Sequence, residues 1–268
     1  MRRIAFIGVG NMANAIIGGL LRSGAVDCPH LILTDTFPEK CAPYTEEGAT
    51  LAPTPAAAAA QADCVVLAVK PQNFPEILSE LAEVEGIASK LIVTIAAGIT
   101  ADTVKTALCG APTVRVLPNT PMLIGMGVSV ICRAPDVSPD DFAFVKATFE
   151  ASGSVTVIDE SEMNRIISVT SSSPAYVFAF INAVCEGAKA QGLDGDALLP
   201  AVCDVFIGAA TLLRDGGLTP AQQISRVTSK GGTTERAMAT LAAHDVDGII
   251  REAMQACTNR ADELASNK

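Results

Sequence analysis

The first candidate functional segment of the sequence is a glycine loop near the N-terminus. Gly8, Gly10 and Ala13 follow the apolar run Ile4–Ile7 in the pattern G-x-G-x-x-A. In such a loop the first glycine permits a tight turn, the second lets the backbone approach a pyrophosphate, and the small third residue allows close helix–strand packing. Free N–H groups at the start of the next helix attract phosphate. Because the loop lies at the first predicted strand–helix junction, the pattern indicates a dinucleotide site rather than an accidental glycine turn.

A carboxylate and a hydroxyl, Asp35 and Thr36, follow the second predicted strand. An acidic residue at this place commonly binds the adenosine ribose hydroxyls, which favours NAD over NADP. Asp35 fits equally well as a turn residue or an N-cap before Pro38. Thr36 could donate a hydrogen bond to a 2′-phosphate, and Lys40 is the nearest cation. We therefore expect NADPH or NADH as the cofactor, with the choice between them open.

The composition argues against several other classes of function. The net charge is −10 and aromatic residues make up 4% of the chain, so neither the basic face nor the stacking platform of a nucleic-acid-binding protein is expected. The eight cysteines stand at least thirteen positions apart, and the only histidines are His30 and His244. This pattern lacks the ligand spacing of a zinc site and is typical of thiols in a reducing cytosol. We expect a cytoplasmic protein that contains no metal and binds no nucleic acid.

Two apolar stretches need to be distinguished from targeting or membrane segments. Arg2-Arg3 followed by Ile4–Leu21 has the charge and length of a signal peptide, but the glycines and asparagines of the loop interrupt it. Further along, Val177–Cys185 stops at Glu186, short of the ~20 apolar residues of a transmembrane span. We expect a soluble, unprocessed chain with no membrane partner.

The elements that must position the loop alternate between strands and helices. The expected strands are continuously apolar or β-branched, as parallel strands covered on both faces are. They are Ile4–Ile7, Leu31–Thr34, Cys64–Val69, Leu91–Ile95, Thr113–Leu117, Val128–Cys132 and Val155–Ile158. The segments between them have helical spacing, including one from about 139 to 151. This alternation predicts an α/β fold, a Rossmann-type doubly wound parallel sheet over residues 1–159.

After the last expected strand the character of the chain changes. From Ser161 onward, apolar residues recur only at helical spacing, with glycine breaks between the segments. Helices such as Ala175–Ala190 and Ala197–Leu213 carry few charges for exposed elements, which predicts obligate dimerisation. We therefore expect an all-helical C-terminal domain, over residues 160–268, for substrate binding and dimerisation.

Five short motifs stand in order after the glycine loop. Three follow expected strands at the carboxyl edge of the sheet, where ligands bind in open α/β folds; they are Ala68-Val69-Lys70-Pro71, Ala96-Ala97-Gly98 and Pro118-Asn119-Thr120-Pro121. Two begin helices: Ser172-Ser173-Pro174-Ala175-Tyr176 and Gly231-Gly232-Thr233-Thr234. Each motif alone is weak, but the set in this order resembles the pyrroline-5-carboxylate reductases along essentially the whole chain.

The resemblance implies reduction of 1-pyrroline-5-carboxylate to L-proline by hydride transfer from NAD(P)H, the last step of proline biosynthesis. The expected cofactor-binding residues are Gly8, Val9, Gly10, Asn11, Met12, Asp35, Thr36, Ala68, Val69, Lys70, Pro71, Ala97 and Asn119. The expected imino-acid contacts are Glu160, Gly231, Gly232, Thr233 and Thr234. The resemblance also implies a homodimer with interleaved helical domains and, as a further expectation, a decamer of five dimers.

The segment Gly231–Thr234 has two interpretations that the residues alone leave open. As structure, it is a helix N-terminus with threonine capping. As chemistry, its free N–H groups would hold the substrate carboxylate, and the Thr234 hydroxyl would bond the ring nitrogen as the catalytic group. A protonated iminium is already activated, so no strong protein acid is needed beside the cofactor.

The sequence departs from the usual family pattern at several positions. Ser171 and Lys230 stand where glycine and proline are common, and Arg226 where some members have asparagine. Asp35-Thr36 replaces a frequent Asn-Arg pair. These differences bear on substrate affinity and nicotinamide preference rather than on the class of reaction.

Two other classes of function remain as alternatives. The β-hydroxyacid dehydrogenases share this plan but use a lysine on the first long helix of the second domain. Here that helix, Ala175–Ala190, has no lysine before Lys189, which disfavours them while leaving related imine reductases open. A non-enzymatic nucleotide-binding regulator would not need the segment Gly231–Thr234.

Overall fold

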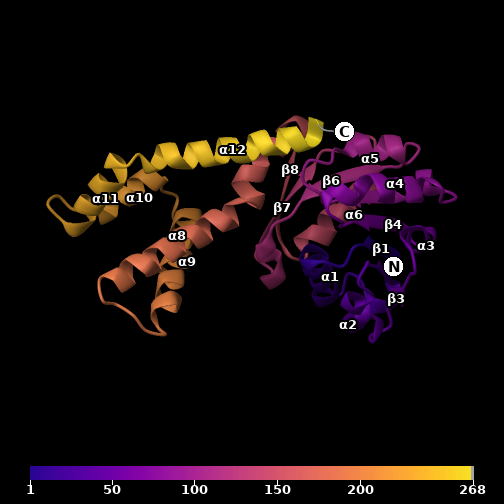
Figure 1. Ribbon diagram of the computed structural model, residues 1–268, viewed down its shortest axis with the longest axis horizontal. Coiled ribbons are helices and arrows are strands. Elements are labelled where there is room, and N and C mark those ends of the chain that lie inside the picture. Colours follow the sequence, from indigo (N-terminus) through magenta and orange to yellow (C-terminus); the bar gives the residue numbers. More distant parts are fainter. Residues whose placement is uncertain (267–268) are drawn as a thin grey trace. The chain divides into compact units, whose positions relative to one another are not determined.

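The computed structural model describes residues 1–266 and contains an eight-stranded sheet with helices on its faces (Figure 1). The strand order is β3-β2-β1-β4-β5-β6-β7-β8. The strands are β1 Ile4–Ile7, β2 Leu31–Thr34, β3 Thr50–Leu51, β4 Cys64–Leu67, β5 Leu91–Thr94, β6 Thr113–Leu117, β7 Gly127–Cys132 and β8 Gly153–Ile158. The expected Rossmann-type fold class is confirmed.

The centre of the sheet explains why these strands read as unbroken apolar runs. β1 pairs in parallel with both β2 and β4, so the strand order reverses between β1 and β4. Every residue of β1, β2, β4 and β5 is buried, as expected for parallel strands covered on both faces. The carboxyl ends of β1 and β4 therefore form the point of the sheet at which open α/β folds bind ligands.

Two features of the sheet differ from the prediction. β7 runs antiparallel to β6, and β8 runs parallel to β7. The connection from Leu117 to Gly127 is shorter than the dozen or so residues that a parallel crossover requires. The two-residue strand β3, Thr50–Leu51, was not predicted because so short a run shows no periodicity.

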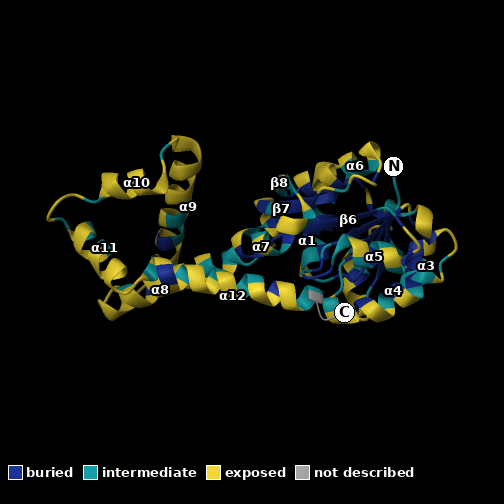
Figure 2. Ribbon diagram, turned by 90° about the horizontal axis from the view of Figure 1, so that it is seen from above, coloured by how far each residue is buried: buried dark blue, intermediate teal, exposed yellow. Residues whose placement is uncertain are grey.

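Helices cover the sheet on both faces, which completes the doubly wound arrangement. Ile16 and Leu20 of α1 share a buried cluster with Val145 of α6 on one face. On the other face, residues of α3, α4 and α5 form a second cluster with Val65 and Ile92. Figure 2 shows the buried residues concentrated in this sheet. The helices that accompany the sheet are α1 Asn11–Ser23, α2 Ala42–Thr45, α3 Pro55–Ala60, α4 Phe74–Ala82, α5 Ala101–Ala107, α6 Pro139–Glu150 and α7 Met163–Ile166.

The chain divides into two compact units, which we describe separately. The first comprises residues 1–174 together with the C-terminal stretch from Ala256, and the second comprises residues 175–255. Within the described residues that follow β8, all regular structure is helical. The long helices are α8 Ser173–Ala190, α9 Leu198–Gly216, α10 Pro220–Val227, α11 Thr233–Ala243 and α12 Val246–Ser266. A functional boundary between residues 159 and 160 stays a prediction.

The first unit includes more than the sheet and its crossover helices. α7, the π-helical turn η7 (Ile167–Ser171) and the end of α12 pack on β6 and β7. Met163, Ile167 and Ala261 are buried there with Leu117. Helical segments on both sides of the 175–255 region in sequence therefore belong to the core of the first unit.

One helical stretch has the properties of a possible membrane span. Residues 160–190 are long and apolar enough by length and composition, and 11% of the most apolar window is buried. The stretch is longer than the apolar run expected from Val177 to Cys185, because α7 and η7 lead into α8 and the helical segment therefore begins well before Val177.

Candidate functional site

The glycine loop joins β1 to α1 and requires glycine at its first position. Gly8 has a φ of +94°, and a Cβ there would lie 2.9 Å from the carbonyl oxygen of Ala68. Its N–H donates to the carbonyl oxygen of Thr34 at 2.8 Å. The loop is thus held between β2 and β4, and any side chain at residue 8 would meet the backbone of β4 or adopt a strained conformation.

The second glycine of the loop has a different role. Gly10 is the N-cap of α1, and a Cβ built on it would meet no atom within 4 Å. The N–H of Asn14 bonds the carbonyl oxygen of Gly10 at 2.9 Å, so the N–H groups of Asn11 and Met12 precede the helical ladder. An open space beside these donors fits a phosphate group and supports the dinucleotide interpretation.

Asp35 connects the loop to the turn after β2. Its Oδ2 accepts from the N–H of Val9 at 2.7 Å, while its Oδ1 accepts from the N–H of Phe37 at 2.9 Å and from Lys40 Nζ at 3.1 Å. Burial, the largest influence, raises the pKa of this carboxyl, but these three donors together hold the pKa of Asp35 below its ordinary value. Asp35 is therefore ionised at neutral pH and acts as a turn residue, while a contact with ribose stays a prediction.

A cavity of about 560 Å³ lies against the loop. The predicted cofactor residues that line it are Gly8, Gly10, Asp35, Thr36, Ala68, Val69 and Lys70. Its charged walls include Lys40, Glu76 and Glu80, and no arginine lines it. Val9 is fully buried beneath the loop, and Pro71 begins a short 3₁₀ turn after β4.

Asn119 follows β6 and is 6% exposed. Its Nδ2 donates to the carbonyl oxygen of Thr170 at 3.0 Å, and its Oδ1 accepts from the N–H of Val128 at 2.8 Å. The amide thus joins the end of β6 to η7 and β7. Ala97 is partly buried at the end of β5, against the cluster that contains Leu117. Neither residue lines the cavity beside the glycine loop, so their predicted place near the nicotinamide is a separate part of the site.

Glu160 lies in different surroundings from the cofactor residues. Its Oε1 accepts from Arg115 Nη1 at 2.6 Å. Because β7 and β8 run antiparallel to β6, their carboxyl ends lie at the amino end of β6, whereas Asn119 follows its carboxyl end. The structure therefore does not bring Glu160 together with the glycine loop, and its contact with the imino acid stays a prediction.

The second unit contains the helix start at Gly231–Thr234. Gly231 has a φ of +75°, and its N–H already donates to Glu235 Oε2 at 2.8 Å. The N–H of Gly232 donates to the carbonyl oxygen of Ser229 at 2.9 Å. Two of the expected carboxylate donors are thus engaged within the chain. The first backbone bond of α11 runs from Arg236 N to Gly232 O, which leaves the N–H groups of Thr233 and Thr234 ahead of the ladder.

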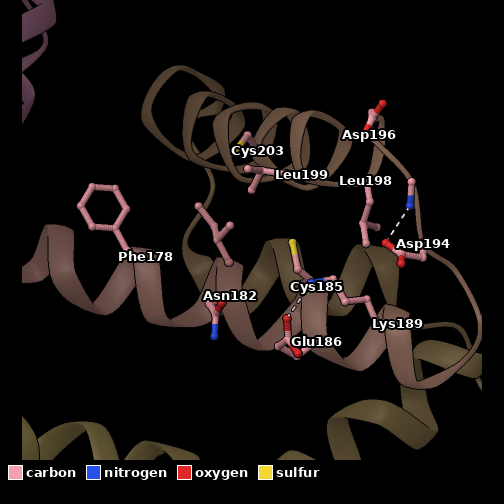
Figure 3. Close-up of a pocket in the computed structure, with 12 residues that line it drawn as sticks. Phe178, Asn182, Cys185, Glu186, Lys189, Asp194, Asp196, Leu198, Leu199 and Cys203 are labelled. Atoms are coloured by element: carbon pink, nitrogen blue, oxygen red, sulfur yellow. Dashed lines mark hydrogen bonds and ion pairs between the residues drawn. The ribbon is translucent and has the colours of Figure 1, made fainter.

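The helices of the second unit expose a large apolar surface. Apolar side chains of α8 and α9, including Phe178 and Leu199, line a hollow between the two helices (Figure 3). The volume of this hollow is about 850 Å³. Phe178 is 62% exposed and Leu199 56%. In these two helices only Cys185 and Val202 are buried. A soluble protein seldom exposes so much apolar surface unless another surface covers it.

Arg115 is the residue that sequence reasoning missed. It is 1% exposed and lies inside the apolar strand Thr113–Leu117. The available signal was a lone cation in a strand that is buried along its whole length, since such a charge must find a partner.

No group of three potential metal-binding side chains (His, Cys, Asp or Glu) comes together in residues 1–266.

Comparisons with known proteins agree with the motifs. Residues 160–264 match the family model described as pyrroline-5-carboxylate reductase dimerisation, and residues 3–98 match the one described as NADP oxidoreductase coenzyme F420-dependent. A pyrroline-5-carboxylate reductase of Vibrio alginolyticus is 36% identical over 98% of this chain and 97% of its own length.

Solved structures of the same enzyme resemble the fold along the whole chain. The pyrroline-5-carboxylate reductase of Coxiella burnetii aligns with a TM-score of 0.88 at 29% identity, covering 99% of both chains. The NADP-bound enzyme of Plasmodium falciparum aligns with a TM-score of 0.91 at 21% identity, covering 99% of this chain and 98% of that one, a likeness of fold alone. With full-length identity above 30% to a curated relative and these matching domains, the chain belongs to the pyrroline-5-carboxylate reductase family.

Proposed function

We propose that this protein reduces 1-pyrroline-5-carboxylate to L-proline with NADPH or NADH, the last step of proline biosynthesis. The single observation that carries the proposal is the full-length similarity to curated enzymes of that name, 36% identical over 98% of the chain. The site supports it, since the glycine loop and the helix start at Gly231–Thr234 provide anion sites in both units. No observation favours a β-hydroxyacid substrate or a purely regulatory role.

The residues around the loop fit the cofactor. The free space at Gly10 and the donors at the start of α1 suit the pyrophosphate. We assign binding of the cofactor to Gly8, Val9, Gly10, Asn11, Met12, Asp35, Thr36, Ala68, Val69, Lys70, Pro71, Ala97 and Asn119. Val9 contributes by its N–H bond to Asp35, which holds the loop in shape. When bound, the dihydronicotinamide supplies the hydride.

The substrate is a carboxylate with a ring nitrogen, and the start of α11 presents groups for both. We propose that the N–H groups of Thr233 and Thr234, which precede the helical ladder, hold the carboxylate at the positive end of the helix. The Thr234 hydroxyl forms a hydrogen bond with the ring nitrogen and so orients the imine carbon. The backbone of Gly231 and Gly232 shapes this turn, and Glu160 is retained as a further predicted contact.

The second unit suits a homodimer. Its family model is described as a dimerisation domain, and the exposed apolar faces of α8 and α9 need a partner. We propose that a second copy of the chain covers them, with a decamer of five dimers as the larger assembly. The same cover accounts for the apolar helix at residues 160–190 without a membrane. We also propose a cytoplasmic location and no nucleic-acid partner.

One spectrophotometric assay tests the reaction. The purified protein is given the imine with NADH or NADPH, and the decrease in reduced cofactor is followed. We expect oxidation of the cofactor and formation of proline, and no oxidation when the imine is omitted. Turnover of β-hydroxyacids with NAD(P) instead, or cofactor binding without turnover of the imine, would replace the proposed function by one of the two alternatives.

A further inference from the structure

A buried cation occupies the middle of β6. Arg115 is 1% exposed and donates from Nη1 to Glu160 Oε1 at 2.6 Å and from Nη2 to Asn164 Oδ1 at 2.9 Å. The pairing is incomplete, since Arg115 Nε and Glu160 Oε2 are buried and have no hydrogen-bond partner among the described residues. Burial and the neighbouring Glu160 raise the pKa of Cys132 to about 12, so this thiol stays neutral.

Such a pair is a poor device for stability alone. Removing the Arg115 guanidinium from water is costly, and the Glu160 side chain is 38% exposed, so water screens the attraction that would offset this cost. The unpartnered polar atoms add to that cost. A role in fixing one arrangement of the chain accounts better for a buried, incompletely bonded guanidinium whose carboxylate partner is partly exposed.

Arg115 and Asn119 hold the two ends of the same segment. Arg115 binds its start through Glu160 and Asn164, and Asn119 binds its end by donating to the carbonyl oxygen of Thr170 at 3.0 Å. The second contact falls inside the π-helical turn η7, which is closed by the bond from Ser172 N to Ile167 O at 2.9 Å. A π turn holds an extra residue, so α-helical bonding alone does not set the register between the two ends. The two contacts on β6 do set it.

The network also reaches the end of α12. Asn164 Nδ2 donates to Asp262 Oδ1 at 2.8 Å. Two residues further on, Leu264 packs over Gly98, where an added Cβ would lie 2.8 Å from the Leu264 Cβ. Gly98 adjoins Ala97, one of the proposed cofactor residues. Through these contacts Arg115 is connected to two segments that adjoin proposed nicotinamide-side residues.

We propose that Arg115 is a positioning residue, which fixes the register of residues 160–171 on β6 and thereby orients the Asn119 amide for the nicotinamide. The inference rests on the proposed function for its last step, the contact of Asn119 with the nicotinamide. Arg115 itself touches neither cofactor nor substrate in this account.

The test replaces both charges at once, so that neither is left without its partner. We expect Arg115→Met/Glu160→Leu to fold and to bind NAD(P)H nearly as wild type, while kcat falls about tenfold or more, equivalent to ~1.4 kcal/mol. Amide exchange of residues 163–172 should become faster in the same variant. Arg115→Lys keeps the charge but loses the guanidinium that donates to two acceptors at once. Its kcat and its rate of amide exchange should therefore lie between those of wild type and those of the double variant.

Two further variants separate positioning from direct contact. Arg133→Met removes a cation from an exposed pair with Asp159, in which both side chains are 65% exposed, and should change neither kcat nor amide exchange. Asn164→Leu removes the second Arg115 contact and leaves Glu160 in place, so it should lower kcat and speed amide exchange of residues 163–172, each less than the double variant does. If Asn164→Leu kept wild-type kcat and wild-type exchange while the double variant lost kcat, the loss would come from Glu160 itself and the positioning role would be overturned.

The remaining outcomes also decide the question. Wild-type kcat together with wild-type amide exchange in the folded double variant would overturn the proposal. Should the double variant not fold, Asn164→Leu keeps the Arg115–Glu160 pair and removes the second contact; faster exchange at residues 163–172 would support the proposal, and unchanged exchange would overturn it. If wild type reduced no imine, the proposed function would fail, whereas the exchange measurement would still test the register.

Discussion

The two compact units differ in how far each completes its own core. In the first, β1, β2, β4 and β5 are buried along their whole length between helices that also belong to that unit. In the second, α10 and α11 contain no buried residue and α8 and α9 one each. Because the first unit completes its own core, the role of a residue there can be inferred from the contacts it makes within that unit. An exposed apolar surface ties function to assembly, because its burial needs another molecule.

The largest effect should come from the glycine loop, where the first unit acts alone. Gly10→Val should abolish NAD(P)H binding and leave the protein folded, because its Cβ enters open space that we assign to the pyrophosphate. Gly8→Ala is the contrasting variant, which should destabilise the fold, since residue 8 has a φ of +94° and contacts Ala68. Calorimetry for the cofactor and thermal unfolding measure the two effects. Unchanged affinity in folded Gly10→Val would refute the assignment.

The second unit should lose assembly rather than fold when its apolar surface is charged. Phe178→Asp would bury an unpaired carboxylate in the proposed dimer, which should weaken dimerisation by about a hundredfold or more. Leu51→Asp, at the edge of the first unit and 47% exposed, is the matched control and should stay dimeric. Sedimentation measures both. A monodisperse wild-type monomer at micromolar concentration would contradict the contrast between the units.

Thr234→Ala tests whether the second unit takes part in chemistry as well as assembly. The change keeps the backbone donors and removes one hydroxyl. A hydrogen bond to a charged group contributes ~1.5–3 kcal/mol, so kcat/KM for the imine should fall about ten- to two-hundredfold at ~1.4 kcal/mol per decade. NAD(P)H affinity should remain nearly intact. Thr170→Ala and Ser171→Ala should do much less. Full kcat/KM in Thr234→Ala would leave only the backbone as a carboxylate site.

The smallest effect is expected at Asp35. Asp35→Ala removes a repulsion toward a 2′-phosphate and one proposed hydrogen bond to ribose. The ratio of kcat/KM for NADPH to kcat/KM for NADH should therefore rise about fivefold, which corresponds to ~1 kcal/mol. Affinity for both cofactors should also fall, because the buried N–H of Val9 loses its acceptor. Lys40→Met, which spares that bond, is the control. An unchanged ratio would confine Asp35 to the turn and the loop.

Much of the first unit was predictable because each element has a local cause. Apolar runs flanked by helical spacing predicted the major strands, and the glycine spacing predicted the junction of β1 with α1. The direction of β7 depends on the length of one connection, and β3 depends on pairing with β2 over two residues. Local patterns contain neither kind of information.

The site shows the same division. Asp35 was expected either to bind ribose or to form a turn. The structure adds a further role, because its carboxylate also accepts a hydrogen bond from the N–H of Val9 in the glycine loop. Two donors expected for the substrate carboxylate, at Gly231 and Gly232, are taken by Glu235 and Ser229. Such competition among acceptors depends on side-chain geometry, which the order of residue types does not specify.

The order of residues was enough to predict the fold class, the glycine loop and the set of motifs that marks the family, because each depends on neighbours within a few residues or on motif order. The folded chain was needed to show that Arg115 and Asn119 hold the same segment, and that Glu160 lies toward the other edge of the sheet from the glycine loop. The physical reason is that the antiparallel pairing of β6 with β7 reverses the edge at which the following residues emerge. Glu160 is thereby separated in space from the cofactor residues near which the motifs were expected to place it. The buried Arg115 is paired with this carboxylate, forty-five positions later in the chain.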